Sequence, residues 1–223
     1  DYHGDKFDSR FDVRGEKNPL VKAVEAMGRK ASDVTDLVLS HLHFDHVGGI
    51  GIKNNQGELE AVFKNASLHL HRDHWAYAHT PTERDSGSFH THDFDPVVDF
   101  YRKENKIVWH EGETGTILTY DDGQELNFKC SHGHTPFLMH PYDNKFIYLA
   151  DLIPTSNHVH IPWVMGYDIS PGVTTKDKRE FLDFIIEKDL TIIYEHDPKF
   201  WGSKVVTDLS LIHISEPTRR TPI

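Results

Sequence analysis

The pattern of apolar residues and the length of the chain predict one domain of the α/β class. Short apolar and β-branched runs, which are typical of strands, alternate with segments whose apolar residues recur at helical spacing. A chain of 223 residues is long enough for one domain with a substantial core. Strands and helices in alternation favour helices packed on the faces of β-sheets.

The first half of the chain is predicted to contain two helices and two strands before a long polar segment. Leu20, Val21, Val24 and Met27 recur at helical spacing and predict a helix over residues 19–30. Strands are predicted at residues 35–40 and 67–70, and a second helix at residues 72–79. Residues 81–102 form a polar insertion that ends in a predicted helix over residues 96–102.

The second half is predicted to be richer in strands. Runs at residues 107–109, 116–119 and 126–130 predict successive strands, with turn residues such as Asp121-Asp122-Gly123 between them. The apolar runs at residues 146–150 and 190–194 predict buried strands. Residues 176–188 predict an amphipathic helix with Phe181, Phe184 and Ile185 on one face.

Three histidines and one aspartate follow the strand predicted at residues 35–40: His41, His43, Asp45 and His46. Imidazole and carboxylate are ligands of zinc and similar divalent metals. In an extended segment or loop, side chains two residues apart point the same way, so His41 and His43 can converge on one metal. Asp45 and His46 are adjacent and diverge, so they can serve a second metal. The two glycines that follow permit a tight turn.

Further candidate ligands stand at the ends of other predicted strands. His132 and His134 follow the strand at residues 126–130, Asp151 follows the strand at 146–150, and His196 follows the strand at 190–194. Sites in layered α/β folds form at the carboxyl ends of strands. His132 and His134 are alternatives for the same position.

In these motifs the chain resembles the metallo-β-lactamase superfamily over about residues 18–205. The HxHxDH signature of that family stands at residues 41–46, and its later ligands match His134, Asp151 and His196 in the same order. The resemblance selects His134 over His132, because Gly133 precedes it and Thr135-Pro136 follow it. It implies a four-layer αββα sandwich.

The resemblance also implies a centre of two divalent metals, with Zn²⁺ as the expected ion. In that pattern one metal is held by His41, His43 and His134, the other by Asp45, His46 and His196, and Asp151 bridges the two. A hydroxide that bridges the metals would be the nucleophile, and Asp45 would be the catalytic acid that passes a proton to the leaving group.

The activity implied is a dinuclear zinc-dependent hydrolase acting on a small ester, lactone or organophosphate. His46 favours this branch, since many true β-lactamases of the superfamily carry a different residue there. Three alternatives stay open: a glyoxalase II-like thioesterase, an iron-dependent persulfide-type oxidoreductase of the same fold, and a non-catalytic metal-binding relative. The thioesterase predicts a basic patch that this acidic chain does not favour, and the complete ligand set disfavours the other two.

The segment after Asp151 is expected to form a wall of the substrate pocket. Residues 153–165 are rich in proline, histidine and apolar residues, and His158 and Trp163 are the candidate substrate-binding residues. One position departs from the acyl-homoserine lactonases of the superfamily, which usually carry tyrosine three residues after the bridging aspartate. This chain has Pro154 there, so a phenol that stabilises an oxyanion would come from another residue, such as Tyr167.

Other histidines are expected to have a surface or structural role, with a third metal as the alternative, and the single cysteine is expected to be structural. His69, His71 and His74 do not fit the ligand pattern. Cys130 excludes an intrachain disulfide and is expected in the core, because free cysteine is usually buried.

The composition limits the partners that the chain is expected to bind. The formal net charge of −11 argues against binding to nucleic acid, because nucleic-acid-binding proteins use clustered Lys and Arg to contact phosphates. No apolar run approaches the roughly 20 residues that a membrane span needs. We therefore expect a small-molecule substrate, no nucleic-acid or membrane partner and a cytoplasmic location. A homodimer and a signal peptide stay open.

Both ends depart from the family pattern. Residues 1–17 are polar, where family members usually have several strands, so we expect N-terminal strands to be missing. Residues 209–223 resemble the translation of a transposon adapter used in sequencing libraries. We expect the hydrolase domain to cover residues 1–208 and residues 209–223 to be a non-native tail, in which His213 is no ligand; a native strand-like tail is the alternative.

Overall fold

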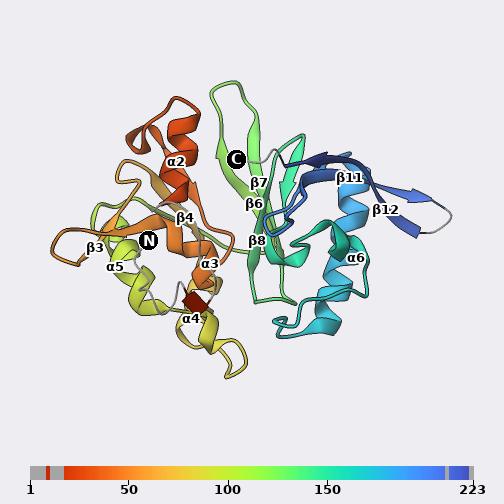
Figure 1. Cartoon of the computed structure of the whole chain (residues 1–223), viewed down its shortest axis with the longest axis horizontal. Coiled ribbons are helices and arrows are strands. Elements are labelled where there is room, and N and C mark those ends of the chain that lie inside the picture. Colours follow the sequence, from red (N-terminus) through yellow and green to blue (C-terminus); the bar gives the residue numbers. More distant parts are fainter. Residues whose placement is uncertain (1–8, 11–17, 209–210, 221–223) are drawn as a thin grey trace. The chain divides into compact units, whose positions relative to one another are not determined.

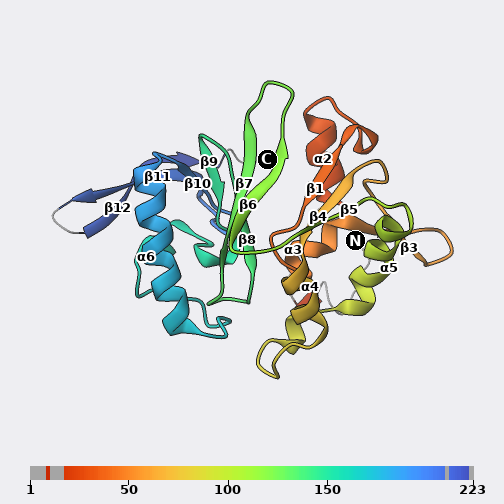
Figure 2. The ribbon, with the colours of Figure 1, turned by 180° about the vertical axis from the view of Figure 1, so that it is seen from behind.

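The computed structural model describes residues 9–10, 18–208 and 211–220 in two compact units, Asp1–Trp109 and His110–Ile223. Each unit combines β-sheet with helices, which confirms the predicted α/β class (Figures 1 and 2). The polar segment expected at residues 1–17 lies, apart from residues 9–10, outside the described residues. Within the described ranges, no helix has the length and apolar character needed to cross a membrane.

The first unit is built around a small sheet with the strand order β1-β4-β5. These strands are β1 (Asp36–Val38), β4 (Ser67–His71) and β5 (Ile107–His110), and β1 runs parallel to β4. A separate antiparallel pair consists of β2 (Gly51–Lys53) and β3 (Leu59–Ala61). The helices are α2 (Pro19–Ala26), α3 (Phe44–Val47), α4 (Arg72–His79) and α5 (Thr91–Lys103).

Helix α5 supplies much of the core of the first unit. Phe94, Val97, Val98 and Tyr101 are fully buried, and their spacing forms one continuous apolar stripe. This stripe packs against β2, β3 and β4. The helix is longer than the one predicted at residues 96–102, and Pro96 lies inside it. The apolar face that begins at Phe94 accounts for this, because its burial offsets the cost of the proline.

The second unit contains a seven-stranded sheet with the order β12-β11-β10-β9-β8-β7-β6. Its strands are β6 (Thr114–Thr119), β7 (Glu125–Ser131), β8 (Leu138–Tyr142), β9 (Phe146–Tyr148), β10 (Thr191–Ile193), β11 (Phe200–Asp208) and β12 (Leu211–Arg219). Neighbouring strands are antiparallel except for β9 and β10, which are parallel. That parallel pair carries two candidate ligands, because Asp151 and His196 both follow its carboxyl ends.

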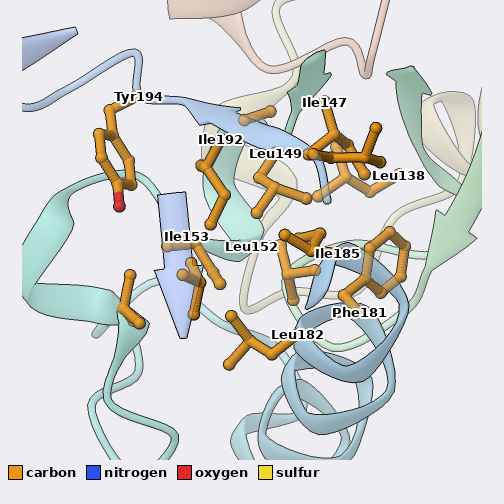
Figure 3. Packing of buried hydrophobic residues seen from close by; sticks show 14 residues of the cluster. Leu138, Ile147, Leu149, Leu152, Ile153, Phe181, Leu182, Ile185, Ile192 and Tyr194 are labelled. Atoms are coloured by element: carbon orange, nitrogen blue, oxygen red, sulfur yellow. The ribbon is translucent and has the colours of Figure 1, made fainter. Parts of the chain in front are cut away.

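Helix α6 (Pro171–Glu187) packs on this sheet and closes the core of the second unit. Figure 3 shows Phe181, Leu182 and Ile185 of the helix packed with apolar side chains of the sheet such as Leu138 and Ile192. Full burial of each such side chain contributes roughly 1.5–3 kcal/mol. The helix begins five residues before the predicted start at 176, because Pro171 occupies its first turn, where the missing N–H costs nothing.

Several segments of the second unit differ from the predicted elements, among them β8, β11 and β12. Strand β8 was not predicted, because His140 and Pro141 interrupt its apolar pattern. Strand β12 lies in the expected tail and pairs with β11, while residues 209–210 and 221–223 lie outside the described residues. The non-native origin of residues 209–223 stays a prediction. Cys130 on β7 is buried, as predicted.

Candidate metal centre

The first set of candidate ligands, residues 41–46, lies in the first unit and runs from the loop after β1 into α3. The ring centroids of His41 and His43 are 4.6 Å apart, and those of His41 and His46 are 4.0 Å apart. His41 and His43 are buried, whereas the Asp45 side chain is 42% exposed. Three imidazoles therefore gather at one place, with a carboxylate beside them that solvent can reach.

The backbone of this motif differs in part from the extended segment or loop that we predicted. Extension ends at His43, whose carbonyl accepts hydrogen bonds of 3.0 Å from the N–H groups of His46 and Val47. The side chains of Asp45 and His46 therefore project from a helical turn, and Asp45 Oδ2 lies 3.7 Å from His46 Nε2. The helical turn provides hydrogen-bond partners for backbone N–H groups that no longer pair with a neighbouring strand.

Three histidines outside the signature support this motif. All three are buried, which agrees with the structural role predicted for them and not with the surface role that was its alternative. The Leu42 N–H, between His41 and His43, donates to Nε2 of the buried His74 at 2.9 Å. His71 Nδ1 accepts from the Asp73 N–H at 3.2 Å and caps α4. His69 Nε2 lies 2.9 Å from Asp36 Oδ1 and links β4 to β1. These contacts fix the backbone from which the candidate ligands project.

The second set of candidate ligands, in the second unit, converges on Asp151. Its Oδ2 lies 3.1 Å from His134 Nε2, and its Oδ1 lies 3.2 Å from His196 Nε2. Asp151 is 4% exposed and sits in the 3-10 turn Ala150–Leu152, where Ala150 has a φ of 41°. A left-handed alanine is uncommon and is typical of functional sites. A buried carboxylate that presents one oxygen to each imidazole fits a bridging metal ligand.

His134 is held from its other side by Asp168. Its Nδ1 lies 2.9 Å from Asp168 Oδ1, and both side chains are buried. Burial lowers the pKa of His134, but the hydrogen bonds and charges of Asp151 and Asp168 outweigh it and raise that pKa to about 9. The same negative surroundings favour a divalent cation. No local pattern in the sequence marks Asp168, because it belongs to no motif and lies 34 residues from His134.

His132, the alternative to His134, makes other contacts. Its Nε2 lies 2.8 Å from Glu113 Oε2, and its Nδ1 accepts from the Phe137 N–H at 3.2 Å. The N–H groups of His132 and Gly133 both donate to Asp177 Oδ2 on α6, at 2.7 and 3.0 Å. His134, and not His132, is therefore the histidine of this loop that meets Asp151.

The turn that carries His196 is fixed by the next residue. The Asp197 carboxylate accepts hydrogen bonds from the N–H groups of Ser156, Lys199 and Phe200 and from the Ser156 hydroxyl. Burial raises the pKa of Asp197, but these hydrogen bonds outweigh it and lower that pKa to about 2. Asp197 thus ties the loop after Asp151 to the loop of His196.

The predicted substrate-binding residues lie on the segment between Asp151 and α6. Trp163 is 56% exposed. His158 is partly buried, and its Nδ1 lies 2.8 Å from the Thr155 hydroxyl. Burial and the charge of Lys178 lower the pKa of His158. Tyr167, considered above as a source of a phenol, is 75% exposed. Their role in substrate binding stays a prediction.

Comparison with known sequences identifies relatives among lactonases. The family model described as "Metallo-beta-lactamase superfamily" matches residues 14–196. N-acyl homoserine lactonase AttM of Agrobacterium fabrum strain C58 is 26% identical over 190 residues, which cover 82% of this chain and 65% of the relative. N-acyl homoserine lactonase AttM of Azorhizobium caulinodans is 27% identical over 202 residues, covering 88% and 70% of the two chains. The chain thus spans 65% of the length of the Agrobacterium lactonase that it matches.

Solved structures share the fold. A probable metal-dependent hydrolase from Staphylococcus aureus aligns with a TM-score of 0.82 and 19% identity, covering 100% of this chain and 75% of that one. AidC, a dizinc quorum-quenching lactonase solved in complex with a product, aligns with a TM-score of 0.68 and 20% identity, covering 92% and 71%.

Proposed function

Because the chain belongs to the metallo-beta-lactamase superfamily, we propose that it is a metal-dependent hydrolase of small lactones and esters. The observation that carries the proposal is the pair of contacts of Asp151. Its two carboxylate oxygens lie 3.1 and 3.2 Å from Nε2 of His134 and of His196. Two imidazoles around one buried carboxylate are a set of donors that would suit divalent cations.

The full centre that we propose holds two metals, following the order of ligands in the family. One metal would be held by His41, His43 and His134 and the other by Asp45, His46 and His196, and Asp151 would contribute to both. Support comes from the clustering of each set within its own unit and from the donor types, since imidazole and carboxylate suit Zn²⁺. When bound, the metals would supply a Lewis acid and lower the pKa of water towards neutrality.

Asp45 is the residue that we propose to move a proton. As water adds to the carbonyl carbon of the lactone, the Asp45 carboxylate takes up one of its protons. As the bond between the acyl carbon and the ring oxygen breaks, Asp45 returns that proton to the ring oxygen. The product is an open hydroxy acid, and Asp45 ends as a carboxylate. Its 42% exposure supports this role, because substrate and water can reach it.

The proposed substrate is a lactone with an apolar substituent. The relatives at 26–27% identity are named N-acyl homoserine lactonases. Trp163 offers an exposed apolar surface on the segment after Asp151, and we propose that it packs against an acyl chain while His158 contacts a polar group. Pro154 stands where such lactonases usually have tyrosine, so a different group has to stabilise the carbonyl oxygen.

The test is an acid-release assay with a pH indicator on lactones, aryl esters, thioesters and organophosphate triesters. We expect turnover of lactones or aryl esters that a chelator removes and added Zn²⁺ restores. The variant His196→Ala should lose that turnover, while His92→Ala, whose side chain is 79% exposed, should keep it. Turnover of thioesters alone would move the function to a thioesterase, and metal binding without any turnover would contradict the proposal.

A further inference from the structure

We infer that Asp168 is a positioning residue for His134, which it orients so that Nε2 is the nitrogen left for metal binding. The inference rests on the proposed function, because His134 is one of the ligands proposed there. No sequence motif marks Asp168, which lies on the irregular segment between the 3-10 turn Ser156–Val159 and α6.

The contact between the two side chains is direct and excluded from solvent. Asp168 Oδ1 lies 2.9 Å from His134 Nδ1, and the two side chains are 0% and 1% exposed. A buried carboxylate is costly unless it accepts strong hydrogen bonds. The His134 Nδ1–H therefore donates to Asp168, and Nε2, which faces Asp151 at 3.1 Å, is the nitrogen that would give up its proton to bind a metal.

The backbone holds the two residues in register. The Ile169 N–H donates to the His134 carbonyl at 3.3 Å, and the Ser170 N–H donates to the Gly133 carbonyl at 2.9 Å. Gly133 itself is pressed against α6, since a Cβ at that position would lie 2.2 Å from the Thr174 backbone nitrogen. The segment after Asp168 is thus fastened to the loop of His134, which leaves the carboxylate little freedom to move away.

Lys178 fastens the segment before Asp168. This fully buried lysine of α6 donates from Nζ to the carbonyls of His160, Ile161 and Trp163, at 2.6, 3.3 and 2.8 Å. Its ammonium also interacts electrostatically with Asp168 and offsets part of that buried negative charge. Helix α6 therefore fixes the segment on both sides of Asp168, which is the arrangement that a positioning residue requires.

The competing explanation is that Asp168 and His134 form an ion pair that only stabilises the second unit. The two explanations differ in their effect on metal affinity. We would titrate the parent, Asp168→Asn and Asp143→Asn with Zn²⁺ against a chromophoric chelator, and check folding by circular dichroism. Asp143 is the matched control, because its carboxylate accepts backbone hydrogen bonds in the turn between β8 and β9 and takes no part in the proposed centre.

We expect Asp168→Asn to weaken the binding of one zinc ion by about 10–100-fold, the usual effect of losing such a partner. Asp143→Asn should bind zinc as the parent does. Equal zinc affinity in the parent and in folded Asp168→Asn would overturn the positioning role and leave the proposed function intact. Absence of zinc binding by the parent would overturn both.

A second measurement needs no variant and decides the matter if Asp168→Asn fails to fold. Nuclear magnetic resonance of the zinc-loaded parent with isotope-labelled histidine reports which ring nitrogen of His134 carries a proton. Protonation at Nδ1 with a metal-bound Nε2 is the expected result. A proton on Nε2, or a metal on Nδ1, would overturn the inference, because the bond to Asp168 would then have another role.

Discussion

Gly133 occupies a position where a side chain would collide with the backbone of α6. A Cβ there would lie 2.2 Å from the Thr174 nitrogen and 2.3 Å from its Oγ1. Since helix backbone cannot yield as a flexible side chain can, Gly133→Ala should lower the free energy of unfolding by about 1–3 kcal/mol. Urea denaturation followed by circular dichroism measures this change.

The matched control for that variant is Gly172→Ala. Gly172 lies in the first turn of α6, and a Cβ added there meets no atom within 4 Å. Alanine restricts the unfolded chain and favours the helix, so we expect a gain of about 0.4–1 kcal/mol. A Gly133→Ala protein as stable as Gly172→Ala would contradict the tight contact between the His134 loop and α6.

Lys178 should make the free energy of unfolding depend on pH in the alkaline range. Burial lowers the pKa of Lys178 from 10.5 to about 8, against the opposing charge of Asp168. Below pH 8 the amine is charged in both states, so the full cost of burying it is present. Between about pH 8 and pH 10 the unfolded state binds more protons, and the contribution of Lys178 to the free energy of unfolding rises with pH.

The variant Lys178→Met isolates this effect. It should be less stable than the parent, because three carbonyl groups lose their donor. The difference in the free energy of unfolding should widen from pH 8 to pH 10, when both proteins are denatured with urea. Lys176→Met, at an exposed position of the same helix, should show a difference that does not change with pH. A constant difference for Lys178→Met would refute the depressed pKa.

The candidate ligands could be predicted from sequence because short motifs carry them, whereas their supports could not. His41, His43, Asp45 and His46 occupy consecutive or alternate positions, and chance seldom gives that order. Asp168, by contrast, reaches His134 across 34 residues through an irregular segment. Only the folded chain brings such residues together, so local patterns contain no signal for them.

Helix α6 anchors the His134 loop through the carboxylate of Asp177. One oxygen of Asp177 accepts from the N–H groups of both His132 and Gly133. Hydrogen bonds to a charged acceptor contribute more than neutral ones, so Asp177→Asn, which keeps an acceptor and loses the charge, should cost about 1–2 kcal/mol. Differential scanning calorimetry would show it as a lower melting temperature. Asp183→Asn, exposed on the same helix, should melt as the parent does.

Elements with a long apolar stripe were predictable, and those fixed by tertiary pairing were not. Helices α4 and α6 and strands β5, β6 and β7 lie where the periodicity placed them, within a few residues at their ends. Strand β8 was missed, since its place is set by pairing with β7 and β9 and not by its own pattern. The turn of α3 was missed because four residues are too few to show a helical period.

At the scale of the whole molecule, the chain has two hydrophobic cores, and each of the two units carries some of the candidate ligands. One core surrounds Leu68, Phe94 and Tyr101, and the other surrounds Leu149, Phe181 and Ile192. The HxHxDH residues belong to the first unit, and His134, Asp151 and His196 belong to the second. Separate cores allow the two units to unfold separately.

Removal of metal should lower the stability of the folded chain. A ligand that binds only the folded state stabilises it by about 4 kcal/mol when its concentration is 1,000 times Kd. We expect a chelator to lower the calorimetric melting temperature of the zinc-loaded protein. Added Zn²⁺ should restore the melting temperature of the parent but not that of His43→Ala or His196→Ala, each of which lacks one proposed ligand. A melting temperature that a chelator leaves unchanged would count against the proposed metal centre, because the folded chain would then be equally stable without metal.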